Sequence, residues 1–529
     1  MLNPPPTNRL AAALAASSPR PAPLVEPAAP AATVVELRDY QEEFVHKVRL
    51  EYRNKTKAVL LVAATGAGKT VVFSYISKSA AAKGSRVLIL AHRDQLIKQA
   101  SRKLNDNGVA HGIIMAGYTP NPRRLVQVAS VQTLARRIDK LKKAGIGFDL
   151  IVIDEAHLSA AASYMKVLEA WPEARVLGVT GSPIRLDGKG LGRGQGGCFD
   201  VIVQGITISQ LIAQGYLVKP AVYASKTKVD LSGVKKVGGD FDNAALADVM
   251  DKPVITGSAI AEYQRICPGV PAVAWCANVA HARHVAEQFN AAGIPALALS
   301  GKDDSAERDR ALADLSSGKI KVITFAMLLV EGVDCPAIGA VILLRPTMSL
   351  SSYLQTIGRG LRPIYAPGMP LGTVEQRMAA IDAGPKGRRC FVLDHAGLTF
   401  RHGLADEDRE WSLDGVVKKK GKKKEEDKPV PLAQCPKCFL VHDPQPTCPA
   451  CGHVYEAKVR QLNEEDGELV EVTEDVAARL KRERQREVGG ARTLEELQKI
   501  AAQRGYKPTW AKMVFEARQR KRSGASRPF

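Results

Sequence analysis

A glycine-rich loop carries residue types that bind phosphate. The stretch ATGAGKT follows a run of apolar residues, and Gly66 and Gly68 let the backbone curl so that successive N–H groups converge on phosphate oxygens. Lys69 is expected to reach the β- and γ-phosphates of a nucleotide, and Thr70 to ligate Mg²⁺. The full pattern usually begins with glycine, where this sequence has Ala63. The apolar run before the loop and the helical pattern after it supply the strand–loop–helix context that this chemistry requires.

An acidic pair later in the chain completes this chemistry. In IVIDEAH the apolar positions 150–153 run straight into Asp154 and Glu155. Parallel α/β sheets bind ligands at the carboxyl ends of their strands, so we expect these carboxylates beside the phosphates. Asp154 would hold Mg²⁺ through its water shell, and Glu155 would orient and activate the attacking water. The alternative is a strand that simply ends in solvent, and the Lys69 loop upstream argues against it.

Two series of short apolar runs must position these groups. Continuous β-rich runs separated by amphipathic stretches are typical of parallel sheets covered by helices on both faces. The sequence therefore predicts two doubly wound α/β domains in tandem. The first series is 58–64, 86–92, 126–132, 150–157 and 174–182, and the second is 272–278, 295–301, 320–326, 339–346 and 389–397.

At this point the motifs resemble those of superfamily 2 helicases and translocases. ATGAGKT and DEAH look like the first two signature motifs, and further segments follow in the order that this superfamily shows. An ordered set is far more specific than any single motif. The resemblance covers roughly residues 35–400 and implies two RecA-like domains. The further segments are LRDYQEE (37–43), LAHRDQLIKQA (90–100), ASVQTL (129–134), TGSP (180–183), FAMLLVEGVDCP (325–336) and YLQTIGRGLRP (353–363).

The resemblance also implies roles for single residues. Gln41 would read the adenine, and Gln355 would join the network that faces water or phosphate. Arg359 and Arg362 are three apart, and we expect them at a helix start, where they share a face and their planar guanidinium groups suit the charge on a transferring phosphoryl group. Because they belong to the second domain, the site is complete only when the domains close. The catalytic set is then Lys69, Asp154, Glu155, Arg359 and Arg362. The nucleotide-binding set is Gln41, Thr65, Gly66, Ala67, Gly68, Lys69, Thr70, Asp154, Gly332, Asp334 and Gln355.

Charge and motif details favour DNA as the partner. The chain has 75 Lys and Arg against 55 Asp and Glu, a net charge of +20, which favours a polyanion without deciding the matter. The segments 90–100 and 129–134 resemble those that contact nucleic-acid phosphates. Position 331 is Glu, where the DEAD-box RNA branch usually has arginine, and the second motif is DEAH. Both departures indicate DNA-acting relatives.

A cluster of four cysteines predicts a zinc site. Cys435, Cys438, Cys448 and Cys451 form two CxxC pairs separated by nine residues, and such pairs present four thiolates tetrahedrally to structural zinc. Replacement of one thiolate by His442 or His453 is the alternative. Five other cysteines are scattered singly, a usage typical of a reducing compartment.

The remaining segments divide the chain into seven parts. We expect a disordered Pro/Ala-rich tail (1–33), an ATP-binding domain (34–220), a connector (221–255), a second RecA-like domain (256–400), a charged linker (401–431), a zinc ribbon (432–456) and a basic helical tail (457–529). In that tail TLEELQKIAAQRG begins with a capping box, Thr493 and Glu496. The tail interleaves Tyr506, Trp510 and Phe515 with cations, which suits either base stacking or packing on the preceding helix. The Asp–His pair in LDHAG (393–397) lacks a nucleophile, so we leave it out of the active site.

The order of these parts resembles the bacterial RadD-like DNA-repair ATPases and their phage or plasmid relatives. We therefore expect a DNA helicase or translocase driven by Mg-ATP in DNA repair or recombination, in the bacterial cytoplasm. Single-strand-binding or recombination proteins are the expected partners, and no apolar run approaches the roughly 20 residues of a membrane span. The alternatives are an ATPase scaffold without strand separation and the motor subunit of a restriction system.

Overall fold

The described part of the protein contains two units that differ greatly in size. A computed structural model describes residues 36–185, 188–224, 231, 233–237, 240–301, 303–326, 335–415, 432–455, 487–488, 490–491, 493–503 and 508–522. The chain divides into unit 1, Met1–Tyr455, and unit 2, Glu456–Phe529. Three expected segments lie wholly or mostly outside the described residues: the Pro/Ala-rich tail, the lysine-rich stretch 418–424 and the first part of the basic tail.

The first domain of unit 1 is a seven-stranded parallel sheet in the order β3-β4-β2-β5-β6-β1-β7. The strands are β1 (Ala58–Val62), β2 (Val87–Ala91), β3 (His111–Ile114), β4 (Val126–Ser130), β5 (Leu150–Asp154), β6 (Arg175–Thr180) and β7 (Val201–Gln204). The helices are α1 (Asp39–Arg53), α2 (Lys69–Ala81), α3 (Asp94–Asp106), α4 (Val131–Lys143), α5 (Ala162–Ala170) and α6 (Ile208–Ala213), with short 3-10 turns at η1 (Ala156–Leu158) and η2 (Arg193–Gln195).

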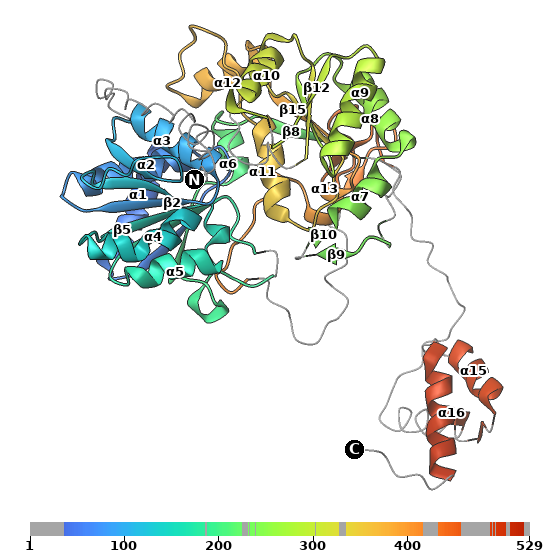
Figure 1. Ribbon diagram of the computed structural model, residues 1–529. Helices are drawn as coiled ribbons and strands as arrows, with labels where there is room; N and C mark the ends of the chain where they lie inside the picture. The colour runs from blue at the N-terminus through green and yellow to red at the C-terminus, as the bar shows by residue number, and fades with distance from the viewer. Residues whose placement is uncertain are drawn as a thin grey trace, which may run out of the picture. The chain divides into compact units, whose positions relative to one another are not determined.

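Both faces of this sheet are buried, which explains the continuous apolar runs. In β1, Val59 and Leu61 belong to one hydrophobic cluster, whereas Leu60 and Val62 belong to another. Alternate residues of a strand point to opposite faces, so a strand covered by helices on both sides needs apolar residues throughout. Figure 1 shows the helices of this domain packed around its sheet.

The second domain holds an eight-stranded sheet in the order β12-β13-β11-β14-β15-β8-β17-β16. Its strands are β8 (Lys219–Ala224), β11 (Ala272–Trp275), β12 (Ala296–Leu299), β13 (Val322–Phe325), β14 (Ala340–Leu343), β15 (Arg389–Asp394), β16 (Ala433–Gln434) and β17 (Leu440–His442). Its helices are α7 (Asn243–Met250), α8 (Pro253–Ile266), α9 (Val279–Ala291), α10 (Ser305–Ser317), α11 (Leu350–Gly360), α12 (Val374–Asp382) and α13 (Leu398–His402). The fold class predicted from the sequence, two parallel-sheet α/β domains, is confirmed.

The segment 221–255 is expected as a connector, and its described residues pack with the second domain. Strand β8 pairs in parallel with β15, which places residues 219–224 inside the second sheet. Two short paired strands, β9 (Lys236–Val237) and β10 (Asp240–Phe241), precede α7. Phe241 of β10 and apolar residues of α7 form a small cluster that includes Ala277. Polar residues and glycines in this stretch made β8 hard to predict from the sequence. The strand becomes buried only because β15, far along the chain, pairs with it.

Residues 404–415, expected as the start of a charged linker, lie against the first domain. Trp411 and Leu413 pack on one of its hydrophobic clusters, and the carbonyl of Leu413 accepts a hydrogen bond of 3.0 Å from the N–H of Gly192. The side-chain amide of Gln204 donates to the carbonyl of Trp411 at 3.4 Å. Two large apolar residues in an otherwise charged stretch provide the hydrophobic burial that fixes this course.

Asp394 of LDHAG has a structural place at the end of β15. Its carboxylate accepts hydrogen bonds from the backbone N–H groups of Ala396 and Leu398 at 3.1 Å and of Thr399 at 2.7 Å. These bonds satisfy N–H groups at the start of α13 that have no partner within the helix.

The described part of unit 2 includes the helices α15 (Leu494–Gln503) and α16 (Pro508–Arg522). The predicted capping box of α15 is confirmed, because Glu496 N donates to Thr493 Oγ1 at 3.2 Å and Thr493 N donates to the Glu496 carboxylate at 3.1 Å. Trp510 and Phe515 pack on the small core that the two helices share, whereas Tyr506 lies outside the described residues. Within the described residues, no helix is both long and apolar enough to cross a membrane.

Candidate functional site

The glycine-rich loop joins β1 to α2 in the first domain. Gly66 and Gly68 adopt left-handed backbone conformations, with φ of 92° and 76°, which glycine enters without steric cost. The loop is tightly enclosed, since a Cβ at Gly68 would lie 2.4 Å from Nε2 of Gln41. The Lys69 ammonium donates to the carbonyl of Ala63 at 3.3 Å, at the first position of the motif. Thr70, the second residue of α2, is half-buried.

Gln41, predicted to read the adenine, is buried against this loop. Its Nε2 donates to the carbonyl of Ala67 at 3.0 Å, and its Oε1 accepts from the N–H of Arg38 at 3.1 Å. The Arg38 guanidinium lies over the ring of Tyr216, 4.1 Å from its centroid. The residues predicted to hold the base and the phosphates are therefore joined by a direct hydrogen bond.

The acidic pair stands at the carboxyl end of β5. Asp154 Oδ1 accepts from the N–H of Glu155 at 3.0 Å, and Glu155 itself adopts a left-handed conformation with φ of 51°. Backbone strain of this kind costs about 1–3 kcal/mol and gathers at functional sites. It turns the Glu155 side chain away from the direction that a regular strand would give it.

The electrostatic environments of the two carboxylates differ. Burial and the neighbouring Glu155 raise the pKa of Asp154, and Lys69 only partly opposes this. Burial also acts to raise the pKa of Glu155, but His157, Lys69 and Arg359 outweigh it and lower that pKa below its ordinary value. The positive charge near Asp154 is thus too small to balance its burial and the neighbouring carboxylate. Together with the hydroxyl of Thr70, it offers the oxygen ligands that Mg²⁺ prefers, so these residues fit the predicted metal.

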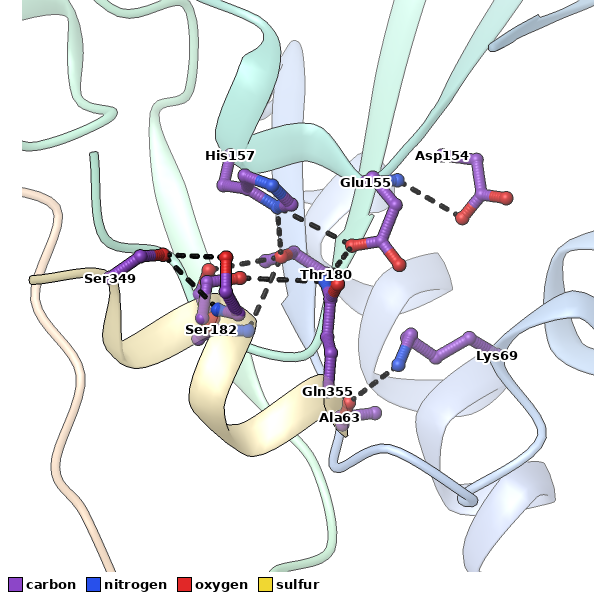
Figure 2. Close-up of polar contacts among 11 residues, drawn as sticks. Ala63, Lys69, Asp154, Glu155, His157, Thr180, Ser182, Ser349 and Gln355 are labelled. Atoms are coloured by element: carbon purple, nitrogen blue, oxygen red, sulfur yellow. Dashed lines mark hydrogen bonds and ion pairs between the residues drawn. The ribbon is translucent and has the colours of Figure 1, made fainter. Parts of the chain in front are cut away.

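The second domain reaches this site through α11. Gln355 Nε2 donates to Glu155 Oε2 at 3.1 Å, across 200 residues of sequence (Figure 2). The glycine at 358 packs directly on the loop of the first domain, because a Cβ there would lie 2.6 Å from Cγ2 of Thr65. Figure 1 draws α11 on the side of its domain that faces the first domain.

The two predicted arginines belong to the same helix end. The expected placement at a helix start is wrong, because α11 begins nine residues earlier, at Leu350. Arg359 is its penultimate residue, and Arg362 follows the helix; both are half-buried. Both guanidinium groups act electrostatically on Lys69, whose pKa burial lowers and whose neighbours Glu155 and Asp154 pull in the opposite direction. The structure therefore brings the arginines of one domain to the lysine and acids of the other.

His157 is a polar neighbour that was not among the predicted site residues. Its Nδ1 lies 3.4 Å from Glu155 Oε2 and 3.3 Å from the hydroxyl of Thr180. That hydroxyl donates to the carbonyl of Ser182 at 3.0 Å, which links the acidic pair to the TGSP segment (Figure 2). Its position two residues after Glu155 in DEAH is the signal that could have found it.

The segments predicted to contact nucleic acid lie together at the ends of β2 and β4. The Gln132 amide donates to the carbonyl of His92 at 3.1 Å, and Ser130 caps α4. The second domain touches the helix of the first of these segments, where Arg308 donates to Gln95 Oε1 at 3.0 Å. The predicted residues Gly332 and Asp334 lie outside the described residues.

The four cysteines of the predicted zinc site converge. Their sulfur atoms lie within 4.8 Å of one another, with Cys435–Cys451 at 3.5 Å and Cys438–Cys448 at 3.7 Å. Zn–S bonds of about 2.3 Å in a tetrahedron place sulfurs about 3.8 Å apart, so this donor set fits zinc. It is the one such group of His, Cys, Asp and Glu in the described part of the chain.

The neighbouring histidine at 442 is engaged elsewhere. Its Nδ1 lies 2.7 Å from the carbonyl of Asp443, and its Nε2 lies 2.7 Å from the hydroxyl of Tyr455. Strand β17, which leaves the first CxxC pair, adds antiparallel to β8, with Leu440 opposite Tyr223 and Val441 opposite Val222. The cysteine cluster therefore fastens an extra edge to the second sheet.

Two family models match separate parts of the chain. The model of the type III restriction enzyme res subunit matches residues 34–185, and that of the helicase conserved C-terminal domain matches residues 263–363. Together they cover the glycine-rich loop, the acidic pair and the two arginines.

Whole-chain comparisons find relatives of several kinds. A 51.5 kDa protein of a Lactococcus phage (isolate 7-9) is 32% identical over 77% of this chain and 81% of its own length. A protein of Saccharomyces cerevisiae named as an ATP-dependent helicase, IRC3, is 31% identical over 62% of this chain, which spans 49% of that protein. This chain thus spans about half of the yeast relative.

Among solved structures, a fragment assigned to the HsdR subunit of a type I restriction enzyme from Vibrio vulnificus YJ016 shares the fold. It superposes with a TM-score of 0.51 at 21% identity, covering 70% of this chain and 66% of that one.

Proposed function

Because the chain belongs to superfamily 2 of the helicases, we propose that it is a nucleic-acid-stimulated ATPase that moves along, unwinds or remodels DNA. One observation carries the proposal: Gln355 of the second domain donates to Glu155 of the first at 3.1 Å, while Gly358 packs on Thr65 of the glycine-rich loop. A nucleotide on that loop then contacts both domains. Binding and hydrolysis therefore change how tightly the domains close, which is how chemistry becomes movement.

The residues of the site divide the work of phosphoryl transfer. The loop N–H groups and Lys69 hold the phosphates. Thr70 and Asp154 would hold Mg²⁺, which would neutralise charge on the phosphate oxygens. Glu155 is ionised at neutral pH because its pKa is lowered. Its carboxylate orients the attacking water and accepts a proton from it. Gln355 and His157 fix the direction of its carboxylate. Arg359 and Arg362 face the charge that develops in the transition state.

Substitution of the acid tests this assignment. Glu155→Gln keeps the size of the side chain but removes the base, and we expect ATP turnover to fall at least 100-fold while DNA binding stays measurable. Lys69→Ala should also abolish turnover. Glu173→Gln, at a side chain that is 94% exposed, is the matched control. Retained turnover in Glu155→Gln would show that another group activates the water.

DNA rather than RNA is the proposed track, and DNA repair or recombination the proposed setting. The net charge of +20 and the DEAH form of the second motif support DNA. ATPase rates measured with single-stranded, duplex and forked DNA and with RNA decide between them. RNA as the best activator would overturn the DNA assignment. Single-strand-binding or recombination proteins are the proposed partners.

A restriction motor is the second candidate, and the match of residues 34–185 to a restriction-enzyme family favours it. Co-purification with a methylase is its signature. A scaffold that hydrolyses ATP without separating strands is distinguished by strand-displacement assays on forked and tailed duplexes.

We also propose one structural zinc ion per chain, held by Cys435, Cys438, Cys448 and Cys451. The convergence of four sulfurs within 4.8 Å supports it. The proposed compartment is the bacterial cytoplasm, supported by the five further cysteines, which are all buried as free thiols.

A further inference from the structure

A lysine outside the recognised motifs lies at the end of the helix that carries the arginines. Lys386 belongs to the loop between α12 and β15, and its half-buried side chain extends toward the C-terminus of α11. Its Nζ donates to the carbonyls of Gly360 and Arg362, each at 2.5 Å, and to the carbonyl of Pro336 at 3.3 Å. An ammonium group has three donors, and these three carbonyls account for all of them.

The electrostatics of a helix end explain why a cation belongs there. The last carbonyls of a helix have no partner within it and carry the negative end of the helix dipole. Carbonyls that converge on one point also repel one another unless a donor lies between them. Burial lowers the pKa of Lys386 to about 8, while the neighbouring thiols Cys390 and Cys335 act in the opposite direction.

The three carbonyls belong to two segments of the site. Gly360 and Arg362 bracket the point where α11 ends, directly after Arg359. Pro336 is the last residue of the segment 325–336, which resembles the fifth helicase motif. The side chain of Lys386 therefore joins the end of the segment 325–336 to the end of the segment 353–363, which resembles the sixth helicase motif.

Packing against the second sheet and the hydrogen bonds of Lys386 together set the direction of the chain at this helix end. A Cβ at Gly360 would lie 2.4 Å from Sγ of Cys390 and 2.9 Å from Cγ2 of Val341, so the helix end rests directly on the second sheet. Beyond Gly360 the chain leaves the helix. Lys386 holds the carbonyls on either side of Leu361, and the carbonyl of Leu361 itself accepts a hydrogen bond of 2.8 Å from the N–H of Val218. The course of this turn decides where Arg362 points.

We propose that Lys386 is a positioning residue for hydrolysis, which holds the C-terminal turn of α11 so that Arg359 and Arg362 meet the transferring phosphoryl group. This inference rests on the proposed ATPase function. Lys386 has no role in binding the nucleotide, because its three donors are directed to backbone carbonyls of its own domain. Its loss should therefore reduce kcat and leave the KM for ATP nearly unchanged.

Lys386→Met, which keeps the length of the side chain but removes the charge, tests the proposal. We expect kcat to fall 10- to 100-fold with less than a threefold change in KM. Lys386→Arg restores a cation. If Lys386→Met lowers kcat 100-fold, the kcat of Lys386→Arg should be at least tenfold higher than that of Lys386→Met. Lys319→Met, at an exposed lysine of the same domain, is the matched control. A kcat within twofold of the parent, or equal losses in the Met and Arg variants, overturns the positioning role.

A second measurement separates this inference from the proposed function. Hydrogen exchange of the peptide covering α11 and residues 361–363 should become at least tenfold faster in Lys386→Met, with or without ATPase activity. If the parent protein shows no stimulated ATPase, the proposed function fails. Hydrogen exchange still reports whether Lys386 holds the C-terminal turn of α11. Unchanged exchange in the variant overturns the inference itself.

Discussion

The hydrogen bond between Gln355 and Glu155 gives a direct measure of how far hydrolysis depends on contact between the domains. Its donor and acceptor are 3.1 Å apart and come from different domains. A hydrogen bond to a charged group contributes about 1.5–3 kcal/mol. Since each 1.36 kcal/mol is a factor of ten in rate, Gln355→Met should lower kcat by about 10- to 150-fold. The KM for ATP should change little, because the loop that holds the phosphates is untouched.

Gln355→Glu makes the same test harsher. It sets a second carboxylate about 3 Å from Glu155, and at an effective dielectric constant of about 20 the repulsion is on the order of 5 kcal/mol. Lys69 and Arg359 lie close enough to offset part of this repulsion. The Glu variant should therefore be slower than the Met variant.

The assay is steady-state ATPase at saturating DNA, with kcat and KM determined separately for each variant. Gln498→Met, at an exposed glutamine of unit 2, is the matched control. If Gln355→Met keeps kcat within threefold of the parent, or if the whole effect appears in KM, the contact does not orient the Glu155 carboxylate and the reasoning is refuted.

Two further predictions concern stability. Cys451→Ser, or treatment with a strong chelator, should remove one zinc per chain and lower the Tm by about 5 °C or more, because the cysteine cluster anchors β17 on β8. The control variant Cys198→Ser should keep its zinc. A Cys451→Ser protein that retains a full equivalent of zinc contradicts the four-thiolate site. Asp394→Ala removes the acceptor of two N–H groups in the first turn of α13 and of one just before it, and should destabilise the protein by about 1–3 kcal/mol in urea unfolding, with ATPase per folded molecule unchanged. An unchanged unfolding midpoint, or a specific loss of turnover, would contradict the capping role.

The ATP loop and the strands were predictable because their causes are local. Gly66 and Gly68 supply the conformations that the loop needs, and the ten apolar runs expected as strands all contain one. Strands β3, β7 and β8 were missed, because each is short or lies in a polar setting and becomes a strand only through its neighbour in the sheet.

In the C-terminal unit, too, the features set by nearby residues were predictable and those set by tertiary packing were not. Its capping box lies within four residues and was read correctly from the sequence. Whether Trp510 and Phe515 are available to stack on bases or pack on the preceding helix could not be read in this way. The answer depends on how α15 and α16 pair, and in the structure both aromatic side chains pack on the shared core.

By itself the sequence determined the chemistry available to each domain: a loop for phosphates, an acidic pair at a strand end, a pair of arginines and four cysteines in two pairs. Tertiary structure alone decided which of these groups meet. The contacts Gln355–Glu155, Gly358–Thr65 and Lys386–Pro336 join residues from 50 to nearly 300 positions apart. Backbone periodicity and turn chemistry act over a few residues, whereas such distances are closed only when two sheets and their covering helices pack together.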